Sequence, residues 1–462
     1  MKKQILFILS IVHQFIEQPI QRSFSIVGSR PVGGSVVGSF NAIGSLICIG
    51  LAFCFITFFF VPLHAQDCTP TIEWQKSLGG DTTDQAGSII PTADGGYILA
   101  GYTASNNGDV SGNHGEEDFW VVKLASDGGM IWERALGGIH EEKAHAVIQD
   151  ADGGYVIAGA ARSNNGDVSG NHGIHDFWVV KLDAGGSLLW QSTLGGSASD
   201  IAYDIIQTDD GGYAVAGLTY SNDDQVTGNH GQNDYWVVKL DAGGNLDWQK
   251  TLGGTGKDEA YSIRQTFDGG YIVAGYTASD DSDVTGNHGL DDYWIVKLDA
   301  TGNLMWQNAL GGLKNDIANS IEQTTDGGYI VAGYTSSNSG DVSDNHGNTD
   351  AWIVKLDTAG TLIWQKALGG SSFDYGSEIL RTADGGYVTL GSSLSLDGDV
   401  TGNHGGLDFW ATRQDDNGNV LWQKSLGGSA ADSGVSIKQT ADYGFIVAGF
   451  SNSNDGDVTG NH

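Results

Sequence analysis

Short apolar stretches alternate with polar, glycine-rich stretches along most of the chain. One unit, residues 260–312, reads AYSIRQT, FDGG, YIVAGYT, ASDDSDVTGNHGLD, DYWIVKLD, ATGN and LMWQNALGG. Its four apolar pieces are rich in Ile, Val, Tyr and Trp and are bounded by Gly, Asp and Asn, so each is predicted to be a β-strand. The Asp-Gly-Gly between the first two pieces predicts a tight hairpin turn, because glycine accepts positive φ at no steric cost.

The tryptophans set the period of this pattern. All 13 fall into two series with a constant step of 58 residues. The series are Trp74, Trp132, Trp190, Trp248, Trp306, Trp364 and Trp422, and Trp120, Trp178, Trp236, Trp294, Trp352 and Trp410. Four strands per unit without helical periodicity predict a propeller blade, with an open β-solenoid as the alternative. Because the rings recur in register, we expect them to pack between blades rather than to bind sugars.

The ends of the repeat region suggest how the ring closes. Residues 71–78 form a lone fourth strand, and the last unit stops at His462, before its third strand. The predicted fold is therefore all-β: a seven-bladed β-propeller of four-stranded antiparallel blades, the last blade incomplete in this chain, with the N-terminal strand closing the ring. We expect the gene product to continue with a strand like GxxDFWVVKLD.

The N-terminal part of the chain has a different composition. Residues 45–63 form an apolar run, and Ala65 precedes a potential signal-peptidase cleavage site. We predict two regions, an export signal or apolar segment over residues 1–65 and the propeller over residues 66–462. A retained membrane anchor is the alternative. Residues 2–12 also resemble the start of a signal peptide.

Charge narrows the classes of partner. The chain has 56 acidic and 22 basic residues, a formal net charge of -34. Such a surface repels nucleic acid and anionic lipid, so we expect no nucleic-acid partner and membrane contact only through an uncleaved N-terminal segment. Cys48 and Cys54 lie in the apolar run, which leaves Cys68 alone after cleavage and excludes a disulfide framework. We expect a monomer.

The polar loop SNNGDVSGNHG holds the candidate metal ligands. Its acids are Asp109, Asp167, Asp283, Asp341, Asp399 and Asp457. Carboxylate and carbonyl oxygens suit Ca²⁺, although the spacing does not match an EF-hand and short Asx turns use the same residues. No other cofactor is expected, and calcium at these aspartates is the alternative to a purely structural loop.

Other titratable residues recur once per unit. The histidines of Asn-His-Gly are His114, His172, His230, His288, His346, His404 and His462. The acids after Leu-Gly-Gly are Asp84, Glu142, Asp200, Asp258, Asp316, Asp374 and Asp432, and the hairpin turns carry the series that begins Asp94, Asp152, Asp210. Equivalent copies spread around a ring favour structural hydrogen bonds over a metal centre or an acid–base pair.

Motifs of known enzymes are missing from the repeats. The segment from His140 to His145 resembles a zinc-protease motif, but its histidines are five apart and it lies where a strand begins. There is no nucleophile elbow, phosphate-binding loop or Cys/His cluster. The residues that break the repeat are Gln225, Asp344, Ala351, Arg413, Gln414 and Tyr443. If these cluster at one pocket an enzyme is favoured, and if they are scattered a scaffold is favoured.

The repeat resembles a known family of sequences. Over residues 71–462, the units DGGYIVAGYT, GDVTGNHG and DYWVVKLD followed by Trp are similar to the tandem propeller repeats of large secreted bacterial proteins. This resemblance implies export, often by the type IX route. A weaker similarity to quinoprotein propellers involves Asp183, Gly186 and Trp190 and implies shared architecture only.

These observations favour a non-enzymatic function. We predict a secreted or cell-surface propeller that acts as a binding or scaffold module for a protein or glycan, and we name no catalytic residues. The alternatives are a polysaccharide-active or quinoprotein-like enzyme and a calcium-dependent adhesin.

Overall fold

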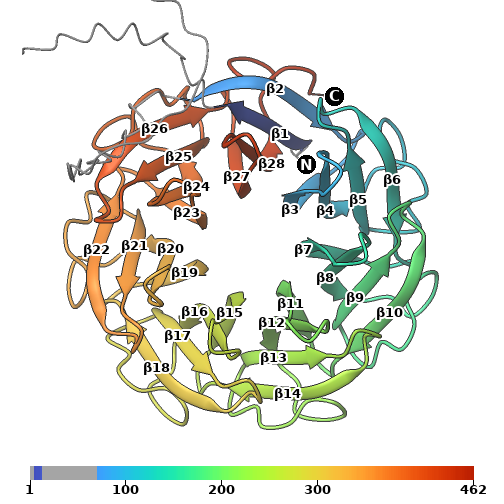
Figure 1. Ribbon diagram of the computed structural model, residues 1–462, viewed down its shortest axis with the longest axis horizontal. Helices are drawn as coiled ribbons and strands as arrows, with labels where there is room; N and C mark the ends of the chain where they lie inside the picture. Colours follow the sequence, from blue (N-terminus) through green and yellow to red (C-terminus); the bar gives the residue numbers. More distant parts are fainter. Residues whose placement is uncertain (1–4, 13–69, 462) are drawn as a thin grey trace, which may run out of the picture. The chain divides into compact units, whose positions relative to one another are not determined.

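The computed structural model describes residues 5–12 and 70–461, and these residues form a ring of β-sheets around a central channel (Figure 1). Contacts divide the chain into one unit of residues 1–13 and 69–462 and a second of residues 14–68. The predicted apolar run, its cleavage site and His462 lie outside the described residues. Within the described part, no helix has the length and apolar character needed to cross a membrane.

The four strands of a blade run from the channel outwards. The innermost strands are β3 (Asp84–Pro91), β7 (Glu142–Gln149), β11 (Asp200–Gln207), β15 (Asp258–Gln265), β19 (Asp316–Gln323), β23 (Asp374–Arg381) and β27 (Asp432–Gln439). The second strands are β4 (Tyr97–Thr103), β8 (Tyr155–Ala161), β12 (Tyr213–Thr219), β16 (Tyr271–Thr277), β20 (Tyr329–Thr335), β24 (Tyr387–Ser393) and β28 (Phe445–Ser451).

The outer half of each of the first six blades has two more strands. The third strands are β5 (Asp118–Leu124), β9 (Asp176–Leu182), β13 (Asp234–Leu240), β17 (Asp292–Leu298), β21 (Asp350–Leu356) and β25 (Asp408–Gln414). The fourth strands are β6 (Met130–Leu136), β10 (Leu188–Leu194), β14 (Leu246–Leu252), β18 (Leu304–Leu310), β22 (Leu362–Leu368) and β26 (Val420–Leu426). Each of these six sheets is antiparallel and comes from one continuous stretch of chain. The repeat thus predicted the strands of these blades correctly.

The expected seven-bladed ring, closed directly by the N-terminal strand at residues 71–78, is wrong. The structure has six continuous four-stranded blades and a partial seventh, to which the last repeat contributes only β27 and β28. That sheet is extended by β1 (Ile5–Val12), paired with β28, and then by β2 (Thr71–Leu78). The backbone of Ile5 pairs with Ser451 as Asp408 pairs with Ser393 in the sixth blade. The N-terminal strand therefore joins the last sheet through β1, because an unpaired edge of β28 accepts any extended segment of matching register.

Every innermost strand carries a β-bulge. In the third blade Ala202 pairs with Gly217 and Asp204 pairs with Ala216, which leaves Tyr203 without a partner across the sheet. A Cβ placed on Gly217 would lie 1.9 Å from the carbonyl oxygen of Ile201, so the repeated glycine of the second strand lets the bulge approach closely.

The hairpin turn between the first and second strands is held by one recurring aspartate in every blade except the sixth, where the amide of Gly386 donates to Asp416 instead. The backbone amide of Gly212 donates to Asp210 Oδ1 at 3.0 Å, and Gly211 has φ of 82°. Lys239, almost fully buried on the third strand, reaches the same aspartate at 2.9 Å. This confirms the structural reading of the turn aspartates.

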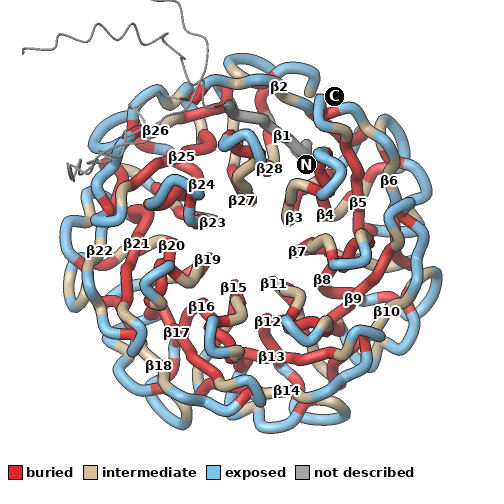
Figure 2. The backbone as a smooth tube through the Cα atoms, in the orientation of Figure 1, coloured by how far each residue is buried: buried red, intermediate tan, exposed pale blue. Residues whose placement is uncertain are grey.

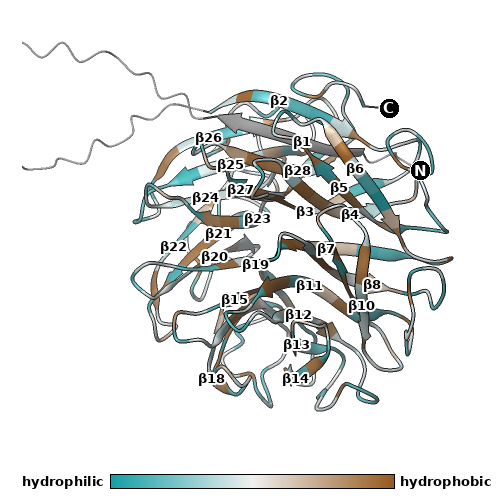
Figure 3. Ribbon diagram, turned by 45° about the vertical axis from the view of Figure 1, so that its right-hand side comes forward, coloured by the Kyte–Doolittle hydropathy of each residue, from teal (hydrophilic) through white to brown (hydrophobic). Residues whose placement is uncertain are grey.

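Burial is concentrated in the middle of each blade. All seven residues of β12 and of β13 are buried, whereas the outer strand β14 is largely exposed or half-buried (Figure 2). Apolar residues mark many of the strands and polar residues mark the connecting loops (Figure 3). Each core therefore lies between neighbouring blades rather than at the centre of the ring.

Tryptophans fill these cores, as predicted. Trp236 is 0% exposed, its ring centroid lies 4.5 Å from that of Phe177 in the preceding blade, and its indole N–H donates to Gln249 at 2.8 Å. Trp190, from the other series, packs against the turn glycine Gly244 of the next blade. Both series thus join adjacent blades, which confirms their packing role.

Candidate functional site

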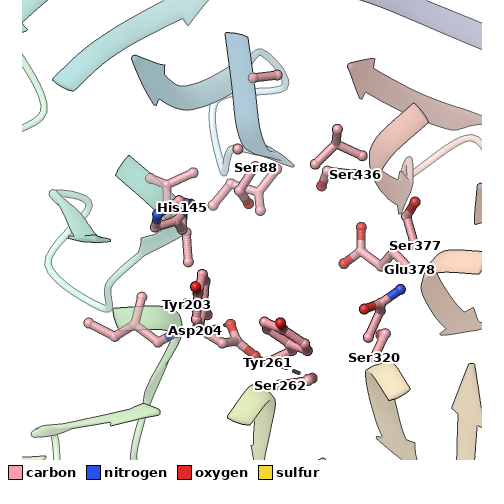
Figure 4. A pocket seen from close by; sticks show the side chains of 18 of the residues that line it. Ser88, His145, Tyr203, Asp204, Tyr261, Ser262, Ser320, Ser377, Glu378 and Ser436 are labelled. Carbon is pink, nitrogen blue, oxygen red and sulfur yellow. Dashed lines mark hydrogen bonds between the residues drawn. The ribbon is translucent and has the colours of Figure 1, made fainter. Parts of the chain in front are cut away.

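The central channel contains a cavity of about 630 Å³ lined by all seven innermost strands (Figure 4). The bulge places one residue per blade in the lining of this cavity. These bulge residues are Gly87, His145, Tyr203, Tyr261, Asn319, Ser377 and Val435. Bulges re-aim side chains and occur often beside functional sites.

Variation at the bulge contrasts with the constancy of one buried position on the same strand. Two residues further along each inner strand, the side chain is Ile in six blades and Val147 in the second. The bulge column itself holds six residue types in seven copies. This buried position keeps the strand packed, so the bulge column is free to differ without disturbing the blade.

One arc of the cavity is aromatic. The ring centroids of His145 and Tyr203 are 5.1 Å apart, and those of Tyr203 and Tyr261 are 4.9 Å apart in an edge-to-face arrangement. In Figure 4 these three side chains follow one another along one side of the cavity, and Ser377 lies on the other side. The bulge residues on the opposite side, such as Gly87 and Ser377, are small. The cavity lining is therefore aromatic on one side only, although the backbone repeats around the ring.

Burial controls ionisation along this arc. It lowers the pKa of His145 to about 4, with a smaller contribution from nearby Lys143, so the imidazole is neutral near pH 7. Burial and then the negative charge of Glu259 raise the pKa values of Tyr203 and Tyr261. The Tyr261 hydroxyl donates to Glu259 at 2.8 Å. The arc is uncharged at neutral pH.

Charged side chains of the channel are paired between blades. Arg264 donates to Asp204 and to Glu322, both at 2.7 Å. Burial alone would lower the pKa of Arg264, but these two carboxylates outweigh it and raise the pKa. Lys438 pairs in the same way with Glu378.

The carboxylates in these pairs also tie the inner strands together. The Asp204 carboxylate accepts the backbone amide of Ile263 at 2.9 Å, and Glu378 accepts that of Ile437 at 2.6 Å. Ser262 holds the same place in its blade, and its hydroxyl accepts the amide of Ile321 at 3.3 Å. Because a neutral serine makes the same type of contact, these acids fit a structural role.

The predicted calcium ligands lie on the loop side of the ring, one per blade. Each carboxylate accepts the amide of the first glycine after the fourth strand, and distances run from 3.2 to 3.5 Å. The six residues are Asp109, Asp167, Asp283, Asp341, Asp399 and Asp457. Gln225 accepts the same bond from Gly195 at 3.2 Å. Among the described residues, no group of three or more His, Cys, Asp or Glu is placed to hold a metal ion. The ring keeps these six aspartates apart, and calcium binding stays a prediction.

The histidines of Asn-His-Gly are hydrogen-bonded turn residues, as expected. His230 Nδ1 lies 2.8 Å from Asp234 Oδ2, and the backbone amide of His230 donates to the same oxygen at 2.9 Å. Equivalent pairs with distances of 2.7 or 2.8 Å occur at His114, His172, His288, His346 and His404.

Burial of the aspartate partners raises their pKa values. The values for Asp234 and Asp292 rise to about 6, and the histidine contacts only partly oppose this effect. Oδ1 of each is buried and has no hydrogen-bond partner within the described residues. A carboxyl group with one unsatisfied oxygen holds its proton more readily.

The acids after Leu-Gly-Gly are structural as well. Asp258 accepts the amide of Gly254 at 2.8 Å and the hydroxyl of Ser279 at 2.9 Å, and it also accepts the hydroxyl of Thr277. The segment from His140 to His145 does not form a zinc-protease motif, because that motif requires a helix and His145 lies in the strand β7.

Residues that break the repeat are scattered around the ring. Tyr443 occupies a turn-glycine position with φ of 67°, and Asp344 occupies a loop-glycine position with φ of 66°. Arg413 replaces the buried lysine and donates to Asp384 at 3.0 Å. None of the named repeat-breaking residues lines the channel cavity. By the criterion set from sequence, their scatter favours a scaffold.

The variable bulge column is the feature that the sequence analysis missed. Its signal was present, since aligning the seven inner strands gives six residue types at the bulge, whereas the buried position two residues further along holds only Ile or Val. Without the ring, nothing indicated that these seven residues face each other. The residues of the quinoprotein resemblance lie elsewhere: Asp183 accepts the amide of Ser187 at 2.8 Å in an outer hairpin turn.

No family model matches the chain. A curated relative, the regulatory protein FlaEY of Caulobacter vibrioides, is 26% identical over 374 residues, which are 72% of this chain and 38% of the relative. The chain therefore spans less than half of that protein.

Solved structures with similar arrangements include other propellers. The Pan2 WD40 domain of Neurospora crassa has a TM-score of 0.45 at 9% identity and covers 79% of this chain and 88% of its own. A protein of unknown function from Bacteroides caccae has a TM-score of 0.36 at 13% identity and covers 64% and 85%. The chain is a β-propeller of repeated blades, as its own sheets establish.

Proposed function

We propose that this protein is a non-enzymatic binding module that works outside the cytoplasm and holds its ligand in the central channel. One observation carries the proposal. The bulge column varies from blade to blade and lines one cavity, although the buried position two residues further along each inner strand stays Ile or Val. A pocket with a few convergent polar groups is the usual form of a small-ligand site.

The acids of the channel support binding rather than catalysis. Catalytic carboxylates need different environments that separate their pKa values. Asp204 and Glu378 instead have similar environments, each with a cationic partner and a backbone amide. The ligand class is a protein segment or a glycan that enters the channel.

Export is the second part of the proposal, and it rests on sequence. The apolar run at residues 45–63 and the resemblance to secreted bacterial repeats support it. Cleavage after Ala65 would remove β1, which lies between β28 and β2, so the mature seventh sheet would keep the β27–β28 pair and β2 would lose its strand partner. Mass spectrometry of the protein recovered from the cell surface or medium tests this, and the expected N-terminal residue is Gln66.

Ligand-dependent thermal stabilisation tests the channel. A panel of glycans, peptides and small metabolites is screened for compounds that raise the melting temperature, since a ligand that binds only the folded state stabilises it. The triple variant His145→Ser, Tyr203→Ser, Tyr261→Ser should lose the response. Tyr443 is not among the residues that line the cavity, and Tyr443→Gly restores the glycine of the other six repeats; this matched control should keep the response.

Two results would contradict the proposal. Stabilising ligands that act equally on the triple variant would place binding elsewhere. A ligand that is chemically changed on incubation, as detected by mass spectrometry, would make the protein an enzyme.

A further inference from the structure

We propose that the channel binds a neutral carbohydrate, with the His145, Tyr203 and Tyr261 arc as the surface on which a sugar ring stacks. This inference rests on the proposed function and names its ligand class. The arc, the paired charges and the unpaired hydroxyl groups each narrow that class.

The aromatic arc favours a ligand with a flat apolar face. His145, Tyr203 and Tyr261 are half-buried at the cavity, and their rings contact one another in sequence. Aromatic rings bury a large area and retain a polar tip, which suits a ligand that is apolar on one face and polar at its edge. A pyranose ring has this character, because its C–H groups form a face and its hydroxyl groups form the edge.

The charge pattern favours a neutral ligand. Asp204 and Glu322 share Arg264, and Glu378 holds Lys438, so the main charged groups of the lining already have partners. An anionic ligand would have to compete with these carboxylates for their cations. Such exchange breaks pairs that also hold the inner strands together, which a neutral ligand avoids.

Unpaired polar groups face the same space. Within the described residues, no hydrogen bond to another protein group is found for the hydroxyl groups of Tyr203, Ser88 and Ser377, which line the cavity. Figure 4 places Tyr203 on the aromatic side, with Ser88 and Ser377 on other sides of the cavity. Hydroxyl groups both donate and accept, so they can pair with a polyol from several directions.

The cavity has the right size for part of a glycan chain. Its volume of about 630 Å³ lies within the range of small-molecule sites, roughly 300 to 1,000 Å³. The small side of the lining leaves space opposite the arc, since Gly87 and Ser377 project little into the channel. A sugar ring stacked on Tyr203 would therefore have room on the side of Gly87 and Ser377.

Binding of defined oligosaccharides tests this inference. Short neutral oligosaccharides of glucose, galactose, mannose and xylose are compared with anionic ones, uronic acid oligomers and heparin fragments, by array and then by calorimetry on the full chain. We expect a neutral oligosaccharide to bind. Tyr203→Ala should weaken it about tenfold, the loss expected for one aromatic contact. Tyr203→Phe keeps the ring and should weaken it less, while Tyr443→Gly should leave it unchanged.

The outcomes separate this inference from the function on which it rests. If peptides or anionic glycans bind and the arc variants abolish that binding, the channel is a binding site but the neutral-carbohydrate assignment is wrong. If a neutral oligosaccharide binds with equal affinity to Tyr203→Ala and Tyr261→Ala, the assignment to the arc is wrong. If no member of either panel responds to the arc variants, both proposals are overturned. Circular dichroism and melting curves confirm that each variant is folded.

Discussion

Two positions in each blade, the third-strand tryptophan and the inner-strand bulge, vary in opposite ways around the ring. Trp236 and its five equivalents are all tryptophan, almost fully buried between neighbouring blades. Tyr203 and its equivalents range from glycine to tyrosine and line the channel. A side chain enclosed by two blades must fit both of them, whereas a side chain at the channel meets mostly open space. The tryptophan position therefore stabilises the packing of the blades, and the bulge position determines which side chains line the channel.

The largest expected effect comes from the buried position. Trp236→Ala removes an indole in contact with Phe177 and leaves a cavity between two blades. We expect a loss of about 3 to 5 kcal/mol in the free energy of unfolding, measured by chemical denaturation. A loss below about 1 kcal/mol would contradict burial of this ring. The tryptophan and the bulge residue would then not differ in their contribution to stability.

The bulge geometry gives the next effect. Gly217→Ala places a methyl group against the carbonyl oxygen of Ile201, and relief requires the bulge at Tyr203 to shift. We expect a destabilisation of about 3 kcal/mol, at the upper end for overpacking. Ala216→Gly on the same strand is the control for loss of a methyl group. Equal melting temperatures for Gly217→Ala and the wild type would show that the bulge does not need this glycine.

Protonation of buried aspartates should make stability depend on pH. Asp234 and Asp292 have folded-state pKa values of about 6, above the usual value of 3.8. A raised pKa means that the folded protein binds the proton more tightly, so their contribution is complete below about pH 4 and is lost as pH rises through 6. Lowering pH from 7 to 5 should therefore add about 1 kcal/mol per residue to the free energy of unfolding.

Titration of a double variant checks the origin of this effect. Asp234→Asn with Asp292→Asn removes both titrations and should make stability depend less steeply on pH between 5 and 7. An unchanged slope would assign the dependence to other groups. At lower pH the turn residues Asp210, Asp268 and Asp326 act in the opposite direction, because their pKa values are lowered to about 2, by hydrogen bonds and buried lysines.

The smallest effect on stability is expected at the channel itself. Tyr203→Ala removes a half-buried ring that contacts His145 and Tyr261 of the neighbouring blades but borders the open channel rather than a closed core, and it should cost under about 1 kcal/mol. Thermal unfolding of Tyr203→Ala and Trp236→Ala under the same conditions measures the difference in stability between the two variants. A cost as large as that of Trp236→Ala would make the arc part of the core and would remove the contrast.

The sequence by itself determined the repeated parts of this protein. Four strands per unit, the hairpin turns, the packing of Trp236 and the hydrogen-bonded turn of His230 all follow from local pattern and recurrence, because each depends on the same neighbours in every blade. Tertiary structure decided two things that have no local cause. Ile5–Val12 joins the last sheet, since an open strand edge accepts a distant segment. The bulge residues meet across the channel because closure of the ring, not their spacing in sequence, brings Tyr203 and Ser377 to one cavity.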